Sequence, residues 1–341
     1  MKRINFGIIG LGRIGIIHLS NISNRIPEAQ VIAVADANEQ NISGNLTAQQ
    51  VKYKFTDFHQ LLATTEVDAV VIATPTNTHA EIILAAAQAK KAIFCERPID
   101  LSIEKTKIAL KSVRDNNVKL MIGFNRRFNP NCYKIYSMIN AQKIGRIHLV
   151  KTTSRETSIP SKKYLESSGG IFLDMSIQDL DMCRFMMGRE VESVFALADR
   201  LWDPSLASIS DYDTALVTLT FEGGGFAVID NSRKSDYGFD HRMEIFGDKG
   251  MLEMQNELVE THRYHNREGV QGSGPVDFFN ERYILSYARE LRDFCSSILS
   301  PNRPISVGGT DALIALEMAI AAKISCHEKR QVHMSEFRLK H

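Results

Sequence analysis

The beginning of the chain constrains the fold most strongly. The apolar run Ile4–Ile9 has the pattern of a buried strand, residues 10–15 read GLGRIG, and a helical pattern follows. A strand, a G-x-G-x-x-G turn and a helix in this order are typical of the phosphate-binding turn of a dinucleotide-binding domain. The alternative is a glycine-rich turn that binds no ligand.

Each glycine of this turn has its own predicted role. Gly10 permits the tight bend, Gly12 lets backbone N–H groups approach a pyrophosphate, and Gly15 lets the helix pack closely on the strand. The free N–H groups and the positive end of the helix dipole would then hold the diphosphate. The phosphate site is expected to comprise Gly10, Gly12, Arg13, Ile14 and Gly15.

A carboxylate follows the second predicted strand, Val31–Ala35. Asp36 lies roughly 20 residues beyond the last glycine, where a dinucleotide-binding domain places its ribose-binding acid. A carboxylate there accepts hydrogen bonds from the adenosine ribose and repels a 2′-phosphate, so NAD is favoured over NADP. The alternative for Asp36 is an N-cap or a turn aspartate.

Short apolar runs alternate with helical patterns over the first 120 or so residues. The further strands are expected at Val67–Ile72, Ala92–Phe94 and Lys119–Ile122. Continuous apolar strands that alternate with helices indicate a parallel sheet covered on both faces. Residues 1–124 are therefore predicted to form a doubly wound α/β domain of the Rossmann type.

A polar segment follows the strand Val67–Ile72. It lies at the carboxyl edge of the predicted sheet, where open α/β sheets bind their ligands. From this segment we expect Thr74, Pro75, Asn77 and His79 to line the cofactor. For His79 the alternative is a residue that only begins the next helix.

The pattern changes after Asn125. Successive strand-like runs with turns between them are predicted at Val191–Ala198, Thr214–Phe221, Phe226–Asp230, Arg242–Phe246 and Met251–Met254. Strands without intervening helices imply antiparallel pairing. Residues 125–341 are thus predicted to form an α+β domain with a large open, mainly antiparallel sheet, and residues 269–275 a mobile loop. An exposed apolar sheet face tends to be covered by a partner, so a homodimer or homotetramer is expected.

Composition argues against several other classes of protein. The formal net charge is +1 and basic residues are interspersed with acidic ones, so no attraction to nucleic acid or to an anionic membrane is expected. The five cysteines are scattered and form no CxxC pair, which argues against disulfides and a zinc site, and no metal is expected. No stretch approaches the ~18 apolar residues that span a bilayer. These features predict a cytoplasmic protein.

Several motifs, taken in order, resemble the glucose–fructose oxidoreductase/inositol dehydrogenase/rhizopine-catabolism (Gfo/Idh/MocA) family. The motifs are GLGRIG (10–15), ATPTNTHA (73–80), CERP (95–98), GFNRRF (123–128), GGIFLDMSIQDLDMCRFMMG (169–188) and DALIALEMAIAAKISCHEKRQV (311–332). The likeness is greatest to its inositol 2-dehydrogenase branch. The resemblance implies an NAD-binding domain, a substrate-binding second domain, and hydride transfer between nicotinamide C4 and a carbon of a cyclic polyol or sugar.

The chain departs from the family at two catalytic positions. The resemblance implies a Glu-Lys-Pro motif, whose lysine touches the reacting hydroxyl, and an Asp-x-x-x-His pair, whose histidine takes the proton. Here these positions read Glu96-Arg97-Pro98 and Asp174-x-x-x-Gln178. Glutamine has no basic group near neutral pH, and arginine stays protonated, so it can polarise an oxygen but not relay a proton. By resemblance, Glu96 and Arg97 also contribute to the cofactor site.

Loss of the imidazole should impair the usual proton transfer. A positioned base contributes about 10²–10⁴-fold, which corresponds to roughly 3–5 kcal/mol of barrier. Asp174 and Gln178 share one helix face, so we expect Asp174 to take the proton while Arg97 binds the emerging oxygen. Pairing with Arg97 would make Asp174 a weaker base. The alternatives are a helix N-cap for Asp174 and a substrate hydrogen bond for Gln178.

Two further side chains are expected on the substrate side. Arg127 matches a substrate-side arginine of the family, with a surface ion pair as the alternative. Tyr237 is expected to face a sugar, with core or interface packing as the alternative.

Three functions are compatible with these residues. The first is an NAD-dependent oxidoreductase of the inositol dehydrogenase type with non-standard proton transfer. The second is a catalytically silent relative that binds NAD(H) and a ligand in a regulatory role. The third is an enzyme that retains and recycles its cofactor without net redox change.

Overall fold

A computed structural model describes residues 3–276 and 279–338. The chain forms two compact units, and each is built from two stretches of sequence. The first unit comprises Met1–Phe128 and Ile284–Ile314, and the second comprises Asn129–Tyr283 and Ala315–His341. The boundary therefore differs from the one expected at residues 124 and 125, because a segment late in the sequence belongs to the first unit.

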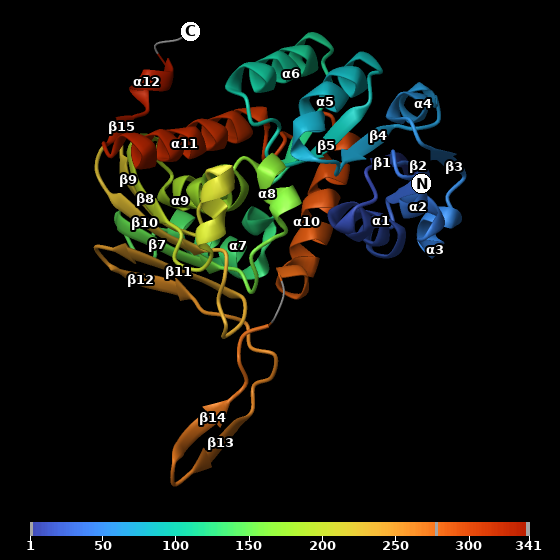
Figure 1. Cartoon of the computed structure of the whole chain (residues 1–341). Coiled ribbons are helices and arrows are strands. Elements are labelled where there is room, and N and C mark those ends of the chain that lie inside the picture. Colours follow the sequence, from blue (N-terminus) through green and yellow to red (C-terminus); the bar gives the residue numbers. More distant parts are fainter. Residues whose placement is uncertain (1–2, 277–278, 339–341) are drawn as a thin grey trace. The chain divides into compact units, whose positions relative to one another are not determined.

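The first unit contains, within the described residues, a six-stranded parallel sheet in the order β3-β2-β1-β4-β5-β6 (Figure 1). Its strands are β1 (Ile4–Ile9), β2 (Ala29–Ala35), β3 (Tyr53–Phe55), β4 (Ala69–Ile72), β5 (Ala92–Glu96) and β6 (Leu120–Gly123). The strand order reverses between β1 and β4, which is the doubly wound arrangement that creates a dinucleotide crevice at the carboxyl ends of the strands. The predicted Rossmann domain is confirmed.

Helices connect these parallel strands. They are α1 (Arg13–Arg25), α2 (Glu39–Ser43), α3 (Leu46–Gln49), α4 (Phe58–Ala63), α5 (His79–Gln88) and α6 (Ile103–Asp115). Side chains that accept hydrogen bonds from first-turn amides begin several of them, including Asp57 at α4 and Ser102 at α6.

Helix α10 (Phe279–Leu299) explains the discontinuous first unit. Its residues Leu291, Phe294 and Cys295 are buried in the core beside the sheet. The ring of Phe294 lies 6.2 Å from that of Phe6 and 6.0 Å from that of Phe94, measured between centroids. The helical periodicity of α10 predicts an apolar face but not which sheet that face covers.

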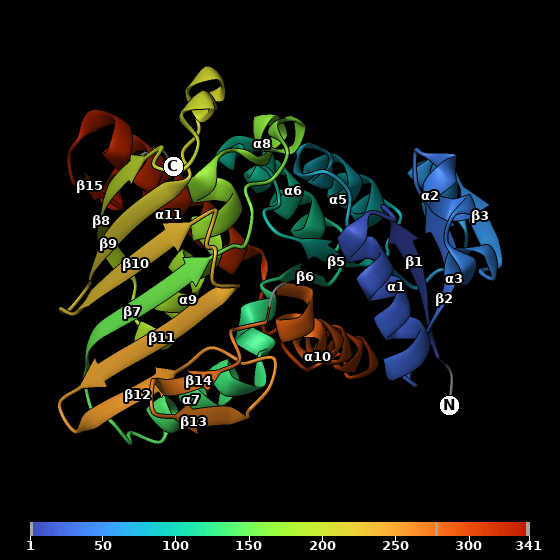
Figure 2. The same ribbon diagram turned by 60° about the horizontal axis from the view of Figure 1, so that its bottom comes forward.

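The second unit contains, in the described part of the chain, a seven-stranded sheet in the order β12-β11-β7-β10-β9-β8-β15 (Figure 2). The strands are β7 (Ile147–Arg155), β8 (Val191–Asp199), β9 (Thr214–Phe221), β10 (Phe226–Ser232), β11 (Asp240–Gly247), β12 (Gly250–Met254) and β15 (Val332–His333). Only β7 and β10 pair in parallel among the neighbours of this sheet as described. The predicted large, mainly antiparallel sheet is confirmed.

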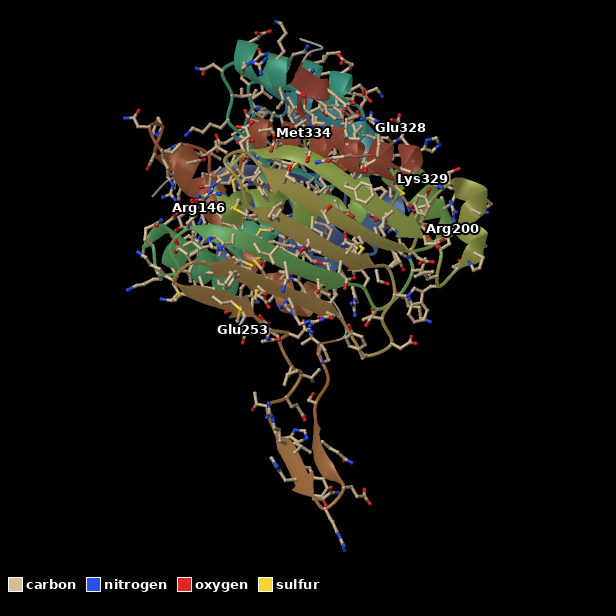
Figure 3. All side chains as sticks on the ribbon, turned by 90° about the vertical axis from the view of Figure 1, so that its left-hand side faces the viewer. Arg146, Arg200, Glu253, Glu328, Lys329 and Met334 are labelled. Carbon is tan, nitrogen blue, oxygen red and sulfur yellow. The ribbon has the colours of Figure 1, made fainter. Side chains whose placement is uncertain are left out.

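The two faces of this sheet differ. Its helices are α7 (Pro130–Asn140), α8 (Lys162–Ser168), α9 (Ile177–Met187), α11 (Gly309–Glu328) and α12 (Ser335–Arg338). Alternate strand residues such as Val217, Ile229 and Ile245 are fully buried. The opposite face, viewed in Figure 3, exposes large apolar side chains, namely Leu197, Leu216, Phe226, Phe246 and Met251. This open face is the one that motivated the expectation of an oligomer.

A hairpin extends from this unit between β12 and α10 (Figure 1). Strands β13 (Arg263–Asn266) and β14 (Gly269–Gly272) pair with each other, and all of their residues are exposed. The structure therefore places strand β14 within the segment 269–275 that was expected to be a loop. No helix in the described part of the chain is long and apolar enough to cross a membrane.

Candidate active site

The glycine turn joins β1 to α1, and its geometry explains why glycine stands at two positions. Gly10 has a φ of +92°, and a Cβ there would lie 2.6 Å from the carbonyl oxygen of Ala73. A Cβ on Gly15 would lie 1.9 Å from the carbonyl oxygen of Gly10. Neither position can accept a side chain without moving backbone, as predicted from the spacing.

Gly12 differs, because a Cβ built on it meets no atom within 4 Å. Packing inside the protein therefore does not require glycine at this position. Gly12 is the N-cap of α1, makes no side-chain cap, and is followed by a first turn without acidic residues. The amides and the positive end of the helix dipole are thus not neutralised by a carboxylate of that turn. This arrangement fits a diphosphate that approaches the backbone closely.

Asp36 ties the end of β2 to the glycine turn. Its Oδ2 accepts a hydrogen bond of 2.7 Å from the amide of Leu11, and its Oδ1 accepts one of 2.9 Å from the amide of Asn38. A carboxylate offers about four acceptor positions, so acceptor capacity remains for ribose hydroxyls. The bond to Asn38 is a local turn contact, but the bond to Leu11 places the carboxylate beside the predicted phosphate site.

The segment after β4 is held by internal hydrogen bonds. The hydroxyl of Thr78 donates to the hydroxyl of Thr74 at 2.7 Å, and Pro75 and Asn77 are exposed at this carboxyl edge of the sheet. His79 is buried, and its Nδ1 and Nε2 each lie 2.8 Å from a backbone carbonyl oxygen, those of Pro98 and Thr74. Burial lowers the pKa of His79, while the two carbonyls act in the opposite direction. His79 thus connects the segments of Thr74 and Pro98, and the cofactor contact expected from the sequence stays a prediction.

A buried polar cluster lies at the end of β5. Nε2 of His18 lies 2.7 Å from Oε1 of Glu96, and the ligand atoms of His18, Glu96 and Glu290 lie within 4.8 Å of one another. Neither carboxyl oxygen of Glu290 has a hydrogen-bond partner, and burial raises the pKa of Glu290 well above its ordinary value, with a further increase from Glu96. The residue types and spacing could accept a metal ion. The bond between His18 and Glu96 and the raised pKa of Glu290 favour a cluster that retains a proton.

The two arginines predicted in the first unit have different surroundings. Arg97 follows Glu96 at the end of β5 and is partly exposed. Arg127 is buried, and its Nη2 lies 3.1 Å from Oδ1 of Asp311, in a salt bridge within the same unit. The ion-pair alternative therefore describes Arg127, although the pair is buried rather than at the surface. The substrate contact expected of Arg127 stays a prediction.

In the second unit, Asp174 lies in a π-helical turn, Phe172–Ser176, that leads into α9. Such turns occur frequently at functional sites. The N-cap position of this turn is Ile171, so Asp174 lies inside the turn and not at its N-cap. Instead, Oδ2 accepts a hydrogen bond of 2.9 Å from Nη1 of Arg233, and Oδ1 accepts one of 2.7 Å from the hydroxyl of Tyr164. The N-cap alternative for Asp174 is thereby excluded.

Arg233 joins two carboxylates. Its Nη2 donates to Oδ2 of Asp211 at 3.2 Å, and Oδ1 of Asp211 accepts from the amide of Ile171 at 2.8 Å. Asp211 also restricts the turn before the π-helix, because a Cβ on Gly170 would lie 3.0 Å from its Oδ1. We call Tyr164, Asp174, Arg233 and Asp211 the aspartate network. It holds Asp174 in place from the strand side.

Gln178 and its neighbour Asp179 are both buried on α9. Asp179 accepts hydrogen bonds from Ser154 at 2.8 Å and from Asn231 at 3.0 Å, so it faces the sheet. Gln178 is one position earlier, four residues after Asp174, as the motif predicts. Asp179, the acid that faces the sheet, is therefore distinct from Asp174 and Gln178, the two positions predicted to be catalytic.

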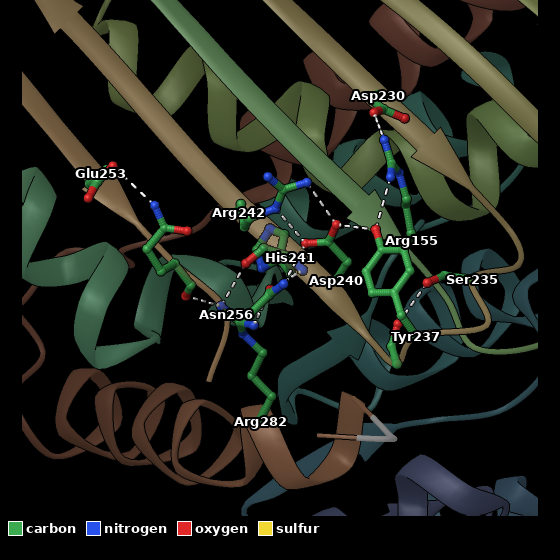
Figure 4. Close-up of polar contacts among 12 residues, drawn as sticks. Arg155, Asp230, Ser235, Tyr237, Asp240, His241, Arg242, Glu253, Asn256 and Arg282 are labelled. Carbon is green, nitrogen blue, oxygen red and sulfur yellow. Dashed lines mark hydrogen bonds and ion pairs between the residues drawn. The ribbon is translucent and has the colours of Figure 1, made fainter. Parts of the chain in front are cut away.

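Tyr237 belongs to a different network, shown in Figure 4. Its hydroxyl donates to Oδ2 of Asp240 at 2.6 Å and accepts from Nη1 of Arg155 at 2.9 Å. Arg155 follows Ser154 on β7, and alternate strand residues point to opposite faces. Since Ser154 contacts Asp179 on the α9 side, Tyr237 is bonded to a residue of the open face. These hydrogen bonds give Tyr237 a structural role, and the substrate contact expected of it stays a prediction.

Sequence reasoning did not select Tyr164, Asp211 or Arg233. Arg233 carried a usable signal, because it directly follows β10 and a charged residue there must find a partner if it is buried. Tyr164 and Asp211 had no comparable signal, since Tyr164 lies in the short helix α8 and Asp211 in an irregular segment after residues 204–209, and neither segment shows a clear periodicity.

Comparison with known proteins decides the family. Residues 4–124 match the domain described as "Oxidoreductase family, NAD-binding Rossmann fold", and residues 133–253 match the "GFO/IDH/MocA C-terminal domain". The chain belongs to the Gfo/Idh/MocA oxidoreductase family. It therefore has an NAD-binding Rossmann domain, as the glycine turn and Asp36 predicted.

Relatives in this family extend over nearly the whole chain. An uncharacterized oxidoreductase of Bacillus subtilis, YrbE, is 44% identical over 95% of this chain and 94% of its own length. The myo-inositol 2-dehydrogenase of Thermotoga maritima is 40% identical over 98% of this chain and 99% of its own length.

A solved structure of the family includes both cofactor and polyol. The scyllo-inositol dehydrogenase of Lactobacillus casei, crystallised with NAD(H) and scyllo-inositol, superimposes with a TM-score of 0.91 at 28% identity. The superposition covers 98% of this chain and 100% of that protein. The predicted family is thus confirmed at the level of domains and fold.

Proposed function

We propose that this protein is an NAD-dependent dehydrogenase of the inositol type, which transfers hydride between nicotinamide and a ring carbon of a cyclic polyol or sugar. The relatives from Thermotoga maritima and Rhizobium meliloti, each 40% identical, are named as inositol 2-dehydrogenases. The observation that carries the proposal is the intact cofactor turn, with the carboxylate of Asp36 bonded to the amide of Leu11.

The proposed cofactor contacts lie in the first unit. The amides of residues 10–15 would bind the diphosphate, and Asp36 would bind the adenosine ribose. When NAD⁺ is bound, its nicotinamide ring supplies the hydride acceptor. Thr74, Pro75 and Asn77 lie at the carboxyl edge of the sheet that this dinucleotide would follow.

The proposed chemical step uses a carboxylate where the family uses an imidazole. Asp174 would take the proton of the reacting hydroxyl, and Gln178 would hydrogen-bond a neighbouring hydroxyl. Arg97, which carries a permanent positive charge, would bind and polarise the reacting oxygen. This assignment accounts for both departures from the family motif without requiring a base at position 178.

A spectrophotometric assay tests the proposal. Protein is mixed with NAD⁺ or NADP⁺ and with a panel of inositol isomers and aldoses, and NADH formation is followed by absorbance. Keto-inositols with NADH test the reverse direction. Turnover of at least one polyol, with a preference for NAD⁺, is expected. No turnover in either direction contradicts the proposal.

Arg97 and Gln178 motivate a second candidate, a silent relative that binds NAD(H) and a ligand without reaction. The double variant Arg97→Lys, Gln178→His distinguishes the two. Activity that appears only in the double variant favours the silent relative, whereas loss of an existing activity favours the enzyme. Cofactor that survives desalting would instead indicate that NAD(H) is retained and recycled.

We also propose that the open face of the seven-stranded sheet is covered by a second copy in a homodimer or homotetramer. The row Phe226, Phe246 and Met251 is exposed and apolar, and the register places these residues opposite one another through Leu149. Sedimentation of the protein and of Phe226→Glu tests this assignment, because a charge at the centre of a buried interface should favour the monomer. A wild-type protein that sediments as a monomer contradicts it.

A further inference from the structure

The aspartate network raises the question of how a substrate proton reaches Asp174. Both carboxylate oxygens already have partners, Arg233 on Oδ2 at 2.9 Å and Tyr164 on Oδ1 at 2.7 Å. The side chain of Asp174 is 14% exposed and that of Arg233 is 2% exposed, whereas Tyr164 is 47% exposed. Tyr164 is therefore the member of the network most accessible from outside the protein.

A phenol group can donate one hydrogen bond while it accepts another. The hydroxyl of Tyr164 donates to Asp174, so an incoming hydroxyl would meet Tyr164 as a donor to its oxygen. A group that accepts on one side and donates on the other can pass a proton without moving its ring. Neither glutamine nor a permanently protonated arginine can do this for Asp174.

The charges of the network favour Asp174 as the final acceptor. Arg233 lies between two carboxylates, at 2.9 Å from Asp174 and 3.2 Å from Asp211, so these three side chains carry one negative charge in excess. A proton on Asp174 brings the three to neutrality, and Arg233 keeps its pair with Asp211. Proton uptake by Asp174 thus removes the excess charge of these three side chains and leaves the pair of Arg233 with Asp211 intact.

Two further titratable side chains, Arg200 and Tyr212, lie beside Asp211 in the described part of this unit. Nε of Arg200 donates to the backbone carbonyl of Asp211 at 2.7 Å, and its guanidinium lies 4.5 Å from the ring of Tyr212. Burial raises the pKa of Tyr212. Tyr212 thus keeps its proton at neutral pH and does not act as the acceptor.

We propose that Tyr164 is the catalytic residue that exchanges the proton with the reacting hydroxyl, and that Asp174 receives this proton through it. The proposal rests on the dehydrogenase function proposed above. In the oxidation direction the substrate O–H bond breaks and its proton joins the oxygen of Tyr164, while the phenolic proton passes to Oδ1 of Asp174. The C–H bond breaks with its electron pair, which leaves as hydride to NAD⁺, and a carbonyl forms. The alcohol is oxidised, NAD⁺ is reduced, and Asp174 later releases the proton to solvent.

Local structure fixes the position of Tyr164. The amide of Tyr164 donates to the carbonyl of Ser161 at 2.9 Å, in the first turn of α8. Gly169 ends α8 with a φ of +89°, which a residue with a side chain rarely adopts, and Gly170 then leads into the π-helical turn of Asp174. The two glycines thus direct the chain so that the phenol and the carboxylate face each other.

The variant Tyr164→Phe tests the relay. We expect kcat to fall about 10²-fold or more in both directions, with KM for the polyol and Kd for NAD⁺ little changed. Tyr133→Phe is the matched control, because Tyr133 is a 60% exposed tyrosine of the same unit on α7. An increase in KM with unchanged kcat would show that the hydroxyl only binds substrate, and would overturn the relay.

A double-mutant cycle adds a second readout. Tyr164→Phe and Asp174→Asn should be strongly non-additive in kcat, because each breaks the same proton path. Fully additive effects contradict a shared path. If the wild-type protein turns over no polyol, the proposed function itself fails; if wild-type turnover is normal and Tyr164→Phe equals it, only the relay fails.

Discussion

Nε2 of His18 on α1 lies 2.7 Å from Oε1 of Glu96 at the end of β5, inside the first unit. His18 is fully buried, with its ring edge against Phe94 and Tyr287 at centroid distances of 5.2 and 5.6 Å. Glu290 of α10 adds a fully buried carboxyl group to this pair. An acid with no hydrogen-bond partner in such surroundings is destabilising when ionised, and this yields the first prediction.

Glu290→Gln should stabilise the protein, and more so at higher pH. The folded-state pKa of Glu290 is raised by burial and by Glu96, so above its unfolded pKa the unfolded chain loses a proton that the folded chain keeps. Stability then falls with increasing pH by about 1.4 kcal/mol per pH unit until the folded pKa is reached. Urea unfolding of both proteins at pH 5.5 and 8 measures the difference. A difference that is the same at both pH values would contradict a raised folded-state pKa.

Gly12→Ala and Gly15→Ala should have different consequences, because an added Cβ would meet backbone atoms at Gly15 but no atom within 4 Å at Gly12. We expect Gly15→Ala to lower the melting temperature and to abolish NAD binding, since its Cβ would overlap the carbonyl of Gly10 at 1.9 Å. Gly12→Ala should fold normally but bind NAD weakly, because the methyl group would enter the space proposed for the diphosphate. Calorimetric titration with NAD⁺ and thermal unfolding provide the two measurements.

The control for this pair is Gly308→Ala, since Gly308 also has no atom within 4 Å of a Cβ and lies outside the glycine turn. It should affect neither property. Gly12→Ala with undiminished NAD affinity would mean that this backbone does not approach the diphosphate.

Asp36→Ala should weaken NAD⁺ binding about 10- to 100-fold, because hydrogen bonds to a charged group contribute roughly 1.5–3 kcal/mol. The preference for NAD⁺ over NADP⁺ should also fall, since the variant no longer repels a 2′-phosphate. Asp57→Ala is a suitable control, because Asp57 is an aspartate of the same unit that only caps α4. Equal Kd values for the wild-type protein and Asp36→Ala would leave the carboxylate with a purely structural role.

Arg233→Met should destabilise the second unit by about 3–5 kcal/mol, because it leaves Asp174 and Asp211 buried near each other without their shared cation. Lys151→Met breaks an exposed pair with Glu244 in the same sheet and should alter stability by less than about 1 kcal/mol. Chemical denaturation of both variants measures the contrast. Similar small losses would show that Arg233 does not hold the two acids together.

Local patterns were sufficient for much of the fold. The spacing of Gly10, Gly12 and Gly15 predicted a tight bend and a close helix, and the structure has both. Alternating and continuous apolar runs predicted the two sheets. The assignment of α10 to the first unit was not predictable. The periodicity of an amphipathic helix shows that one face is apolar, but it does not identify the sheet against which that face packs.

The candidate site was less predictable than the fold. Asp174 was selected through a resemblance, whereas its partners Tyr164 and Arg233 were not. Arg127 and Tyr237 were selected as substrate residues, but the structure places them in contact with Asp311 and Asp240. Charged and phenolic side chains are compatible with both roles, and only their neighbours distinguish them.

The sequence by itself determined the Rossmann topology, the NAD turn with Asp36, and the family, because these depend on glycine spacing and on the periodicity of short segments. Only the tertiary structure decided which side chains share a charge or a proton. Arg233 reaches Asp174 across 59 residues of sequence, and His18 reaches Glu96 across 78. Such pairs arise from strand register and helix packing, which bring distant segments within hydrogen-bond distance and which no local pattern encodes.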